Sequence, residues 1–143
     1  MAYKTVLVHV DQSQQCAMRV KLAAQIAQAQ QAHLPGAAMT GISRYVFDHG
    51  AFNPSDPVFT HHLDHLHQHA RSALSAFENV AASVGVDSVE ARLVDDDAAG
   101  GVALHARYAD LAVIGQFDPA AAVPGGMSNF PETVVLNSGR PML

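Results

Sequence analysis

The sequence predicts an α/β protein built on an open parallel sheet with helices on both faces. Its first strand is an almost wholly apolar run over residues 5–10, which suits a strand covered on both sides. Polar residues 11–13 follow at once and can cap a helix. Segments typical of strands and helices then alternate along all 143 residues, as in strand–helix–strand crossovers. Because ligands bind where the strand order of such sheets reverses, we expect Asp11 and Ser13 to lie at a binding crevice if that point is beside the first strand.

In the first half of the chain, the spacing of apolar residues predicts the helices and strands. A long helix is expected over residues 14–33, ended by Pro35 and Gly36, with the second strand at 37–43. Residues 44–58 are the least regular stretch, and they are interpreted as a loop that covers the sheet edge, as a lid over a ligand or as a patch that binds a partner. The apolar stripe that predicts the helix comprises Cys16, Val20, Ala23, Ala24 and Ala27.

The next elements follow the same logic. A second long helix is expected over residues 59–84, closed by Gly85, and a third strand over 87–94. Residues 95–97 supply a cap for a shorter helix that runs to about Tyr108. The stripe of the long helix comprises Phe59, Leu63, Leu66, Ala70, Ala73, Leu74, Phe77, Ala81 and Val84.

The last third completes a single domain over residues 1–143. A fourth strand at 110–115 precedes a loop over 116–130, and a helix follows from Pro131 to Asn137. Residues 141–143 open a fifth strand that is cut short. We interpret this either as a fragment or as the first half of a longer tandem protein.

Composition excludes several classes of function. The apolar fraction of 49% argues against disorder, and the net charge of −5 without a basic stripe argues against nucleic-acid binding. A single cysteine, Cys16, excludes an internal disulfide and is predicted to pack inside its helix. No apolar run approaches the roughly 20 residues that a membrane span needs, so a cytoplasmic protein without membrane contact is expected.

Three blocks of sequence, in the right order, resemble the universal stress protein (UspA-like) family. They are MAYKTVLVHVDQS at residues 1–13, YADLAVIG at 108–115 and PETVVLNSGRPML at 131–143. The resemblance implies an open five-stranded parallel sheet in the order 3-2-1-4-5, an adenine nucleotide alpha hydrolase-like fold. It also implies a stress-response protein that forms a homodimer or pairs with a tandem second domain.

One branch of that family binds ATP through Gly-x-x-Gly, nine residues, then Gly-Ser or Gly-Thr. Here Gly115 holds the first position, but Asp118 replaces the second glycine. Ser128 and Asn129 stand at the third glycine and the hydroxyl position. A carboxylate where a triphosphate would lie is unfavourable, so the resemblance implies the branch without tight ATP binding. Gly125 and Gly126 leave open a different phosphate cradle.

The resemblance also assigns the other end of this degenerate nucleotide site. Asp11 matches the family position near the adenine and ribose, with Ser13 close by, although both residues also suit capping of the first helix. Ile42 is interpreted either as a wall on the adenine side or as ordinary core.

Histidines give residues 61–69 their distinctive composition. His61, His65 and His69 form an i, i+4, i+8 ladder on an exposed helix face. Neighbouring rungs suit a shared Zn²⁺, Ni²⁺ or Cu²⁺ ion, whereas the plainer interpretation is a solvated surface.

No motif demands an enzyme. There is neither a Gly-x-Ser-x-Gly nucleophile context nor a Gly-x-x-x-x-Gly-Lys-Ser/Thr loop. We therefore expect a non-enzymatic stress-response protein that acts by binding and dimerisation and needs no cofactor. The alternatives are weak ATP or AMP binding with hydrolysis at Asp11, Gly115, Ser128 and Asn129, a metal-responsive protein that uses the histidine ladder with zinc, and a flavodoxin-like electron carrier.

Overall fold

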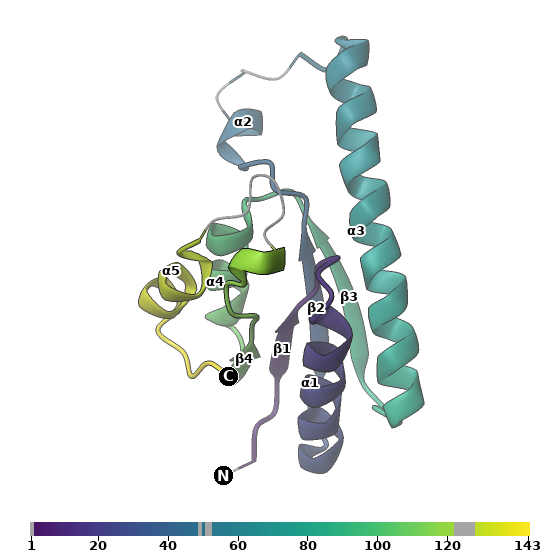
Figure 1. The fold of residues 1–143 in the computed structure, drawn as a ribbon, viewed down its shortest axis with the longest axis vertical. Coiled ribbons are helices and arrows are strands. Elements are labelled where there is room, and N and C mark those ends of the chain that lie inside the picture. The colour runs from purple at the N-terminus through teal and green to yellow at the C-terminus, as the bar shows by residue number, and fades with distance from the viewer. Residues whose placement is uncertain (1, 49, 51–52, 122–127) are drawn as a thin grey trace.

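A computed structural model describes residues 2–48, 50, 53–121 and 128–143 (Figure 1). Its sheet has four strands in the order β3-β2-β1-β4, and every neighbouring pair is parallel. The predicted α/β class and the order of these four strands are confirmed. The strands are β1 (Val6–His9), β2 (Leu34–Met39), β3 (Val89–Val94) and β4 (Leu111–Val113).

The prediction of a fifth strand needs correction for the described residues. At the outer edge of β4, Met142 forms a single parallel bridge with Ala112. The Leu143 amide donates to the Ala112 carbonyl, and the Ile114 amide donates to the Leu143 carbonyl. Three terminal residues supply too few ladder hydrogen bonds for a full strand, so the expected fifth position is occupied by a bridge.

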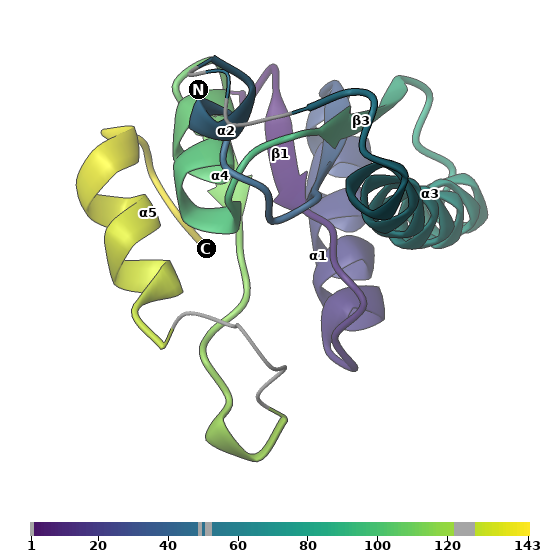
Figure 2. The same ribbon diagram turned by 90° about the horizontal axis from the view of Figure 1, so that it is seen from above.

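Helices cover both faces of the sheet (Figures 1 and 2). On one face lie α1 (Cys16–Gln30) and α3 (Pro57–Val84), and on the other lie α4 (Ala98–Ala106) and α5 (Phe130–Ser138). Two short elements complete the description: α2 (Tyr45–Asp48) and the 3₁₀ turn η1 (Pro119–Ala121). All four residues of β1 are buried, as expected for a strand between two helical layers.

The start of β2 was predicted wrongly. Pro35 and Gly36 looked like a helix end, but both lie inside β2, paired with β3. The helix stops earlier, because Gln31 adopts the left-handed conformation at φ 51° and its amide donates to the carbonyls of Ala27 and Gln28. Gly36 is needed for the packing of α3 against the sheet. A Cβ there would lie 2.6 Å from the ring of Phe77 on α3, so its absence lets that ring lie against the sheet.

The buried residues of the long helix α3 all lie between Ala70 and Ala81. Asp56 caps its start by accepting from the Val58 amide at 3.0 Å, with Pro57 in the first turn. Its first buried residue is Ala70, and its upper half extends past the sheet (Figure 1). The region predicted to be irregular contains the short helix α2, while residues 49 and 51–52 of that region lie outside the described part.

Asp97 caps α4, as predicted: its carboxylate accepts from the Gly100 amide at 2.8 Å. In the described part of the chain, no helix is long and apolar enough to cross a bilayer.

Candidate functional site

The candidate site lies where β1 is flanked by β2 on one side and β4 on the other. This is the topological switch point of the sheet, because the chain leaves β1 toward β2 and returns on the opposite side as β4. Asp11 follows the end of β1 by two residues, and Gly115 follows the end of β4 by two. Both residues therefore follow the two strands that meet at the switch point.

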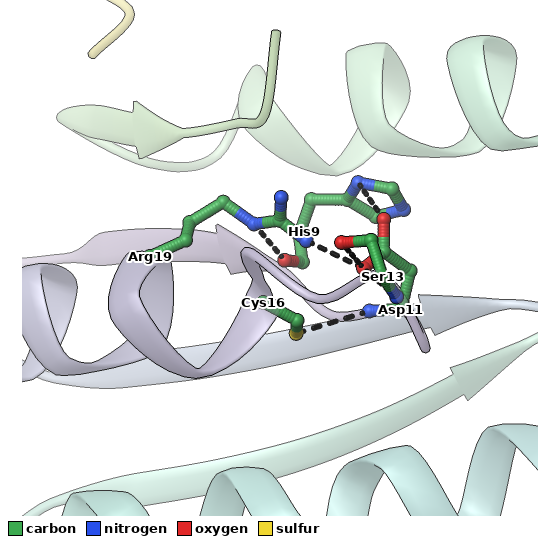
Figure 3. Close-up of polar contacts among 5 residues, drawn as sticks. All are labelled: His9, Asp11, Ser13, Cys16 and Arg19. Atoms are coloured by element: carbon green, nitrogen blue, oxygen red, sulfur yellow. Dashed lines mark hydrogen bonds and ion pairs between the residues drawn. The ribbon is translucent and has the colours of Figure 1, made fainter. Parts of the chain in front are cut away.

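Asp11 organises the loop between β1 and α1 (Figure 3). Its Oδ1 accepts three hydrogen bonds: from the Ser13 amide at 3.0 Å, the Ser13 hydroxyl at 2.6 Å and Arg19 Nη2 at 2.8 Å. Neither Asp11 nor Ser13 caps α1, since the N-cap position is Gln15 and it makes no side-chain capping bond. The two side chains instead stabilise a tight turn at the edge of the crevice.

Arg19 is a site residue that sequence reasoning missed. Its side chain is only 7% exposed, and its Nε donates to the His9 carbonyl at 2.8 Å. Its guanidinium fills the space beside Gly115, where any Cβ would collide with Nη1. A signal was present in the sequence, because Arg19 falls on the buried stripe of α1 three residues after Cys16 and four before Ala23.

His9 is the second missed residue. It ends β1, is 6% exposed, and its ring lies 4.9 Å from the Phe130 ring at the start of α5. Its Nδ1 has no hydrogen-bond partner among the described residues and lies 3.9 Å from Asp11 Oδ2. Burial lowers the pKa of His9 to about 4, against an opposing effect of Asp11, so the ring is neutral at physiological pH.

The charges around Asp11 favour its ionised form. Burial alone would raise its pKa, but the Arg19 guanidinium and the bonds from Ser13 outweigh burial and lower the pKa below its usual value. Asp11 and Arg19 thus form a hydrogen-bonded ion pair that is partly shielded from water. The neighbouring Cys16 thiol is buried, and burial raises its pKa, which fits the predicted packing role.

At the opposite side of the crevice, Asp118 already has partners for both oxygens. Oδ1 accepts from the Ala120 amide at 2.9 Å, and Oδ2 accepts from Gln15 Nε2 at 3.2 Å. Ser128 and Asn129 are exposed and precede α5, where Asn129 holds the N-cap position without a side-chain bond. Gly125 and Gly126, the alternative cradle, lie outside the described residues.

Ile42 follows β2 by three residues and is half-buried. This placement is compatible with either predicted role, as a wall on the adenine side or as core.

The histidine ladder lies in the first half of α3, before its first buried residue, Ala70. The rings of His65 and His69 lie 4.2 Å apart, and His69 Nδ1 also lies 2.9 Å from Gln12 Oε1. His61 begins the ladder eight residues from His69, about 12 Å along the helix axis. Within the described ranges, no group of three or more histidine, cysteine, aspartate or glutamate side chains could hold a metal ion. The ladder therefore gives at most adjacent pairs rather than a three-ligand site.

A groove of about 480 Å³ lies between α1 and α3, beside the same loop. Its floor contains side chains of Cys16, Val20 and Phe77, and the loop closes it at one end. The sequence did not predict this groove, because it depends on the distance between two helices that are far apart in the chain.

Searches with known protein families and curated proteins gave no match to this sequence. Solved structures do match. UspA of Lactobacillus plantarum, a universal stress protein, superimposes with a TM-score of 0.79 at 23% identity, over 100% of this chain and 97% of that one. A universal stress protein in complex with cAMP gives 0.68 at 24%, over 100% and 96%. A universal stress protein family protein from Arabidopsis thaliana with AMP bound gives 0.65 at 15%, over 98% and 89%. The predicted resemblance is thus confirmed at the level of the fold.

Proposed function

We propose that this chain, which has the fold of the universal stress proteins, is a stress-response protein of that type. It acts by binding and association, and its crevice does not hold Mg-ATP tightly. The observation that carries the proposal is the Arg19–Asp11 ion pair, with the guanidinium filling the space that Gly115 leaves open. Gly115, which matches the first glycine of the family's phosphate loop, makes room for the side chain of Arg19.

Electrostatics at the phosphate end support the same conclusion. Asp118 stands where the family's second glycine would be, and its bonds to Gln15 and Ala120 hold the carboxylate in place. A triphosphate at this position would lie beside a fixed negative charge, which is costly in a partly desolvated crevice unless a metal ion intervenes. The only nearby cation in the described crevice, Arg19, is already paired with Asp11.

Weak binding of a nucleoside monophosphate is the second candidate. Structures of this fold include one protein in complex with cAMP and one with AMP bound. Asp11 keeps the position that the resemblance links to adenine and ribose. The unpartnered Nδ1 of the buried His9 lies close to Asp11 Oδ2 and offers a ligand one more hydrogen bond.

Calorimetric titration of the purified protein with Mg-ATP, AMP and cAMP tests both candidates. We expect Mg-ATP to bind more weakly than about 1 mM, corresponding to a standard free energy of about −4 kcal/mol. AMP or cAMP should bind more tightly than Mg-ATP if the second candidate holds. Micromolar Mg-ATP affinity would overturn the proposal. The variant Asp118→Gly isolates the charge effect and should bind Mg-ATP more tightly than wild type.

Nothing in the geometry of Asp11 favours hydrolysis. A general base works best with a pKa near the working pH, whereas the pKa of Asp11 is lowered and its Oδ1 already accepts three hydrogen bonds. We therefore propose a non-catalytic role, which an assay for phosphate release from ATP checks. The metal-responsive alternative receives no support from the described side chains.

Self-association is proposed through the surface next to β4. Val135 and Leu136 on α5 and the terminal Leu143 are 49%, 83% and 54% exposed, so these apolar side chains are available for contact with a second copy. Sedimentation velocity should show a dimer, and Leu136→Glu should shift it toward monomer. A monomeric wild type at high concentration would argue instead for pairing with a second domain.

A further inference from the structure

A groove between α1 and α3 begins at the loop over residues 11–13. Its volume of about 480 Å³ lies within the usual range for small-molecule pockets, roughly 300–1,000 Å³. Residues 11–13 line one end of the groove, and Ser72 adds a hydroxyl from α3. Cys16, Val20 and Phe77 are the buried residues beneath it.

Small side chains keep the groove open. Ala17 on α1 and Ala76 on α3 are exposed at its rim, and Ala73 lies below them. Because these side chains end at Cβ, the two helices leave space above the buried Val20 and Phe77. The floor that a ligand would contact is therefore apolar, and burial of an apolar body there is favourable at about 25 cal/mol per Å².

The end of the groove is polar and rich in acceptors. Asp11 is the one charged residue in the lining, and no Lys or Arg is among the lining residues. The Ser13 hydroxyl already donates its hydrogen to Asp11 Oδ1, so its oxygen remains available only as an acceptor. A head group that donates hydrogen bonds matches this end. The charge of Asp11 is paired with Arg19, so a carboxylate head group is disfavoured because it has no hydrogen to donate to these acceptors.

Gln12 fixes the position of that polar end. Its Nε2 donates to the His69 carbonyl at 3.3 Å, and its Oε1 lies 2.9 Å from His69 Nδ1. This two-point contact joins the loop after β1 to α3, so the groove is closed at the loop and open along the helices. The polar end is thus tied to both helices that form the walls.

We propose that the groove binds a small amphiphile whose apolar body lies between α1 and α3 and whose head group, an alcohol or an amine, donates hydrogen bonds to the loop at residues 11–13. The groove shares Asp11 and Ser13 with the candidate nucleotide site, but its apolar floor lies between the two helices. Arg19, which fills the crevice, is not part of the groove lining.

Competition with a neutral fluorescent probe, N-phenyl-1-naphthylamine, tests this proposal on the full chain. Octanol, octylamine and octanoate share one apolar body and differ in the head group. We expect octanol and octylamine to displace the probe at concentrations about tenfold below octanoate, because only octanoate has no hydrogen to donate to the acceptors of residues 11–13. Equal displacement by all three, or no probe binding, would overturn the proposal.

A matched pair of variants locates the binding. Ala76→Phe places a ring in the groove, whereas Ala82→Phe adds the same ring at an exposed alanine of α3 that does not line it. Probe binding should fall at least about tenfold in the first and stay at the wild-type level in the second. If both variants bind alike, the proposal is wrong. Should Ala76→Phe fail to fold, Ala17→Phe tests the same point from the opposite wall.

The single thiol provides a second readout in the wild-type protein. Cys16 lies in the groove floor, so an occupant should slow its alkylation by N-ethylmaleimide. Saturating octanol should reduce the rate severalfold, while the same concentration of AMP should not. Unchanged alkylation in the presence of octanol would place the amphiphile elsewhere and contradict the proposal.

Discussion

The guanidinium of Arg19 and the missing side chain of Gly115 fit each other. Arg19 reaches from α1 across the end of β1, and its Nη1 occupies the position that a Cβ at residue 115 would need. The Nε–His9 and Nη2–Asp11 bonds, each 2.8 Å long, keep the side chain there. A glycine that family resemblance alone would assign to phosphate binding thus has a structural requirement within this chain.

Gly115→Ala should therefore destabilise the fold. Overpacking of a close contact costs typically about 1–3 kcal/mol, because the guanidinium has to shift and its two hydrogen bonds lengthen. Urea unfolding monitored by circular dichroism measures the loss. In an Arg19→Ala background the same substitution should cost much less, since nothing remains for the new methyl to meet. Additive effects in this double-mutant cycle would refute the contact.

His9 should give the fold a specific pH dependence. Its folded pKa is about 4, and its unfolded pKa is near 6.5, so the unfolded state binds more protons between these values. Stability is then complete above about pH 6.5 and falls as the pH is lowered toward 4. Between pH 7.5 and 4.5 the loss from this group is on the order of 2–3 kcal/mol.

His9→Asn isolates this contribution. The variant should lose less stability than wild type over the same pH interval, as measured by urea midpoints at several pH values. Asp11 does not interfere, because its lowered folded pKa makes its own contribution decline only at more acidic pH. His61→Asn, at an exposed position on α3, is the matched control. Parallel profiles for wild type and His9→Asn would exclude the buried neutral histidine.

Gly36→Ala should damage the core on the α3 side of the sheet. The new Cβ would lie 2.6 Å from the Phe77 ring, which is 1% exposed and has little room to move. We expect a loss of about 1–3 kcal/mol in thermal or urea unfolding. Phe77→Leu removes the clash, so the double variant should lie closer to Phe77→Leu than the sum of the single effects predicts.

Asp97→Ala should weaken the start of α4. The substitution removes the acceptor for the Gly100 amide, and loss of such a cap costs about 0.5–2 kcal/mol. Asp97→Asn should retain most of the stability, because asparagine is as good a cap. Asp87→Ala, at an exposed carboxylate outside any helix, serves as the control. Equal urea midpoints for Asp97→Ala and Asp87→Ala would contradict the assignment.

Helices and the order of elements were predictable because periodic apolar residues report local structure directly. The stripe from Cys16 to Ala27 is buried as predicted. The start of β2 was not predictable in this way, since Pro35 and Gly36 have strong turn propensity and their place in the strand depends on β3 and Phe77. Such contacts join residues about 40 or more positions apart, and no local pattern records them.

The site shows the same division. Asp11 and Ser13 were predicted near the switch point because they follow the first strand, and Gly115 because of the strand order that the family resemblance implies. The structure has Asp11 and Gly115 two residues after β1 and β4. Arg19 and His9 were missed because their chemistry follows from burial, which a charged or polar residue within an apolar pattern signals only indirectly. The charge of Asp118 could be predicted from the sequence. Its hydrogen bond from Gln15 could not, because the two residues are far apart in the chain.

Residues 11–13 belong both to the candidate nucleotide site and to the groove between α1 and α3. Asp11 is paired with Arg19, and Gln12 is hydrogen-bonded to His69 on α3. Ser13 donates to Asp11 and also lines the groove. A ligand that shifts this turn from one site would change the affinity of the other site. By thermodynamic reciprocity, each ligand would then alter the affinity of the other by the same factor.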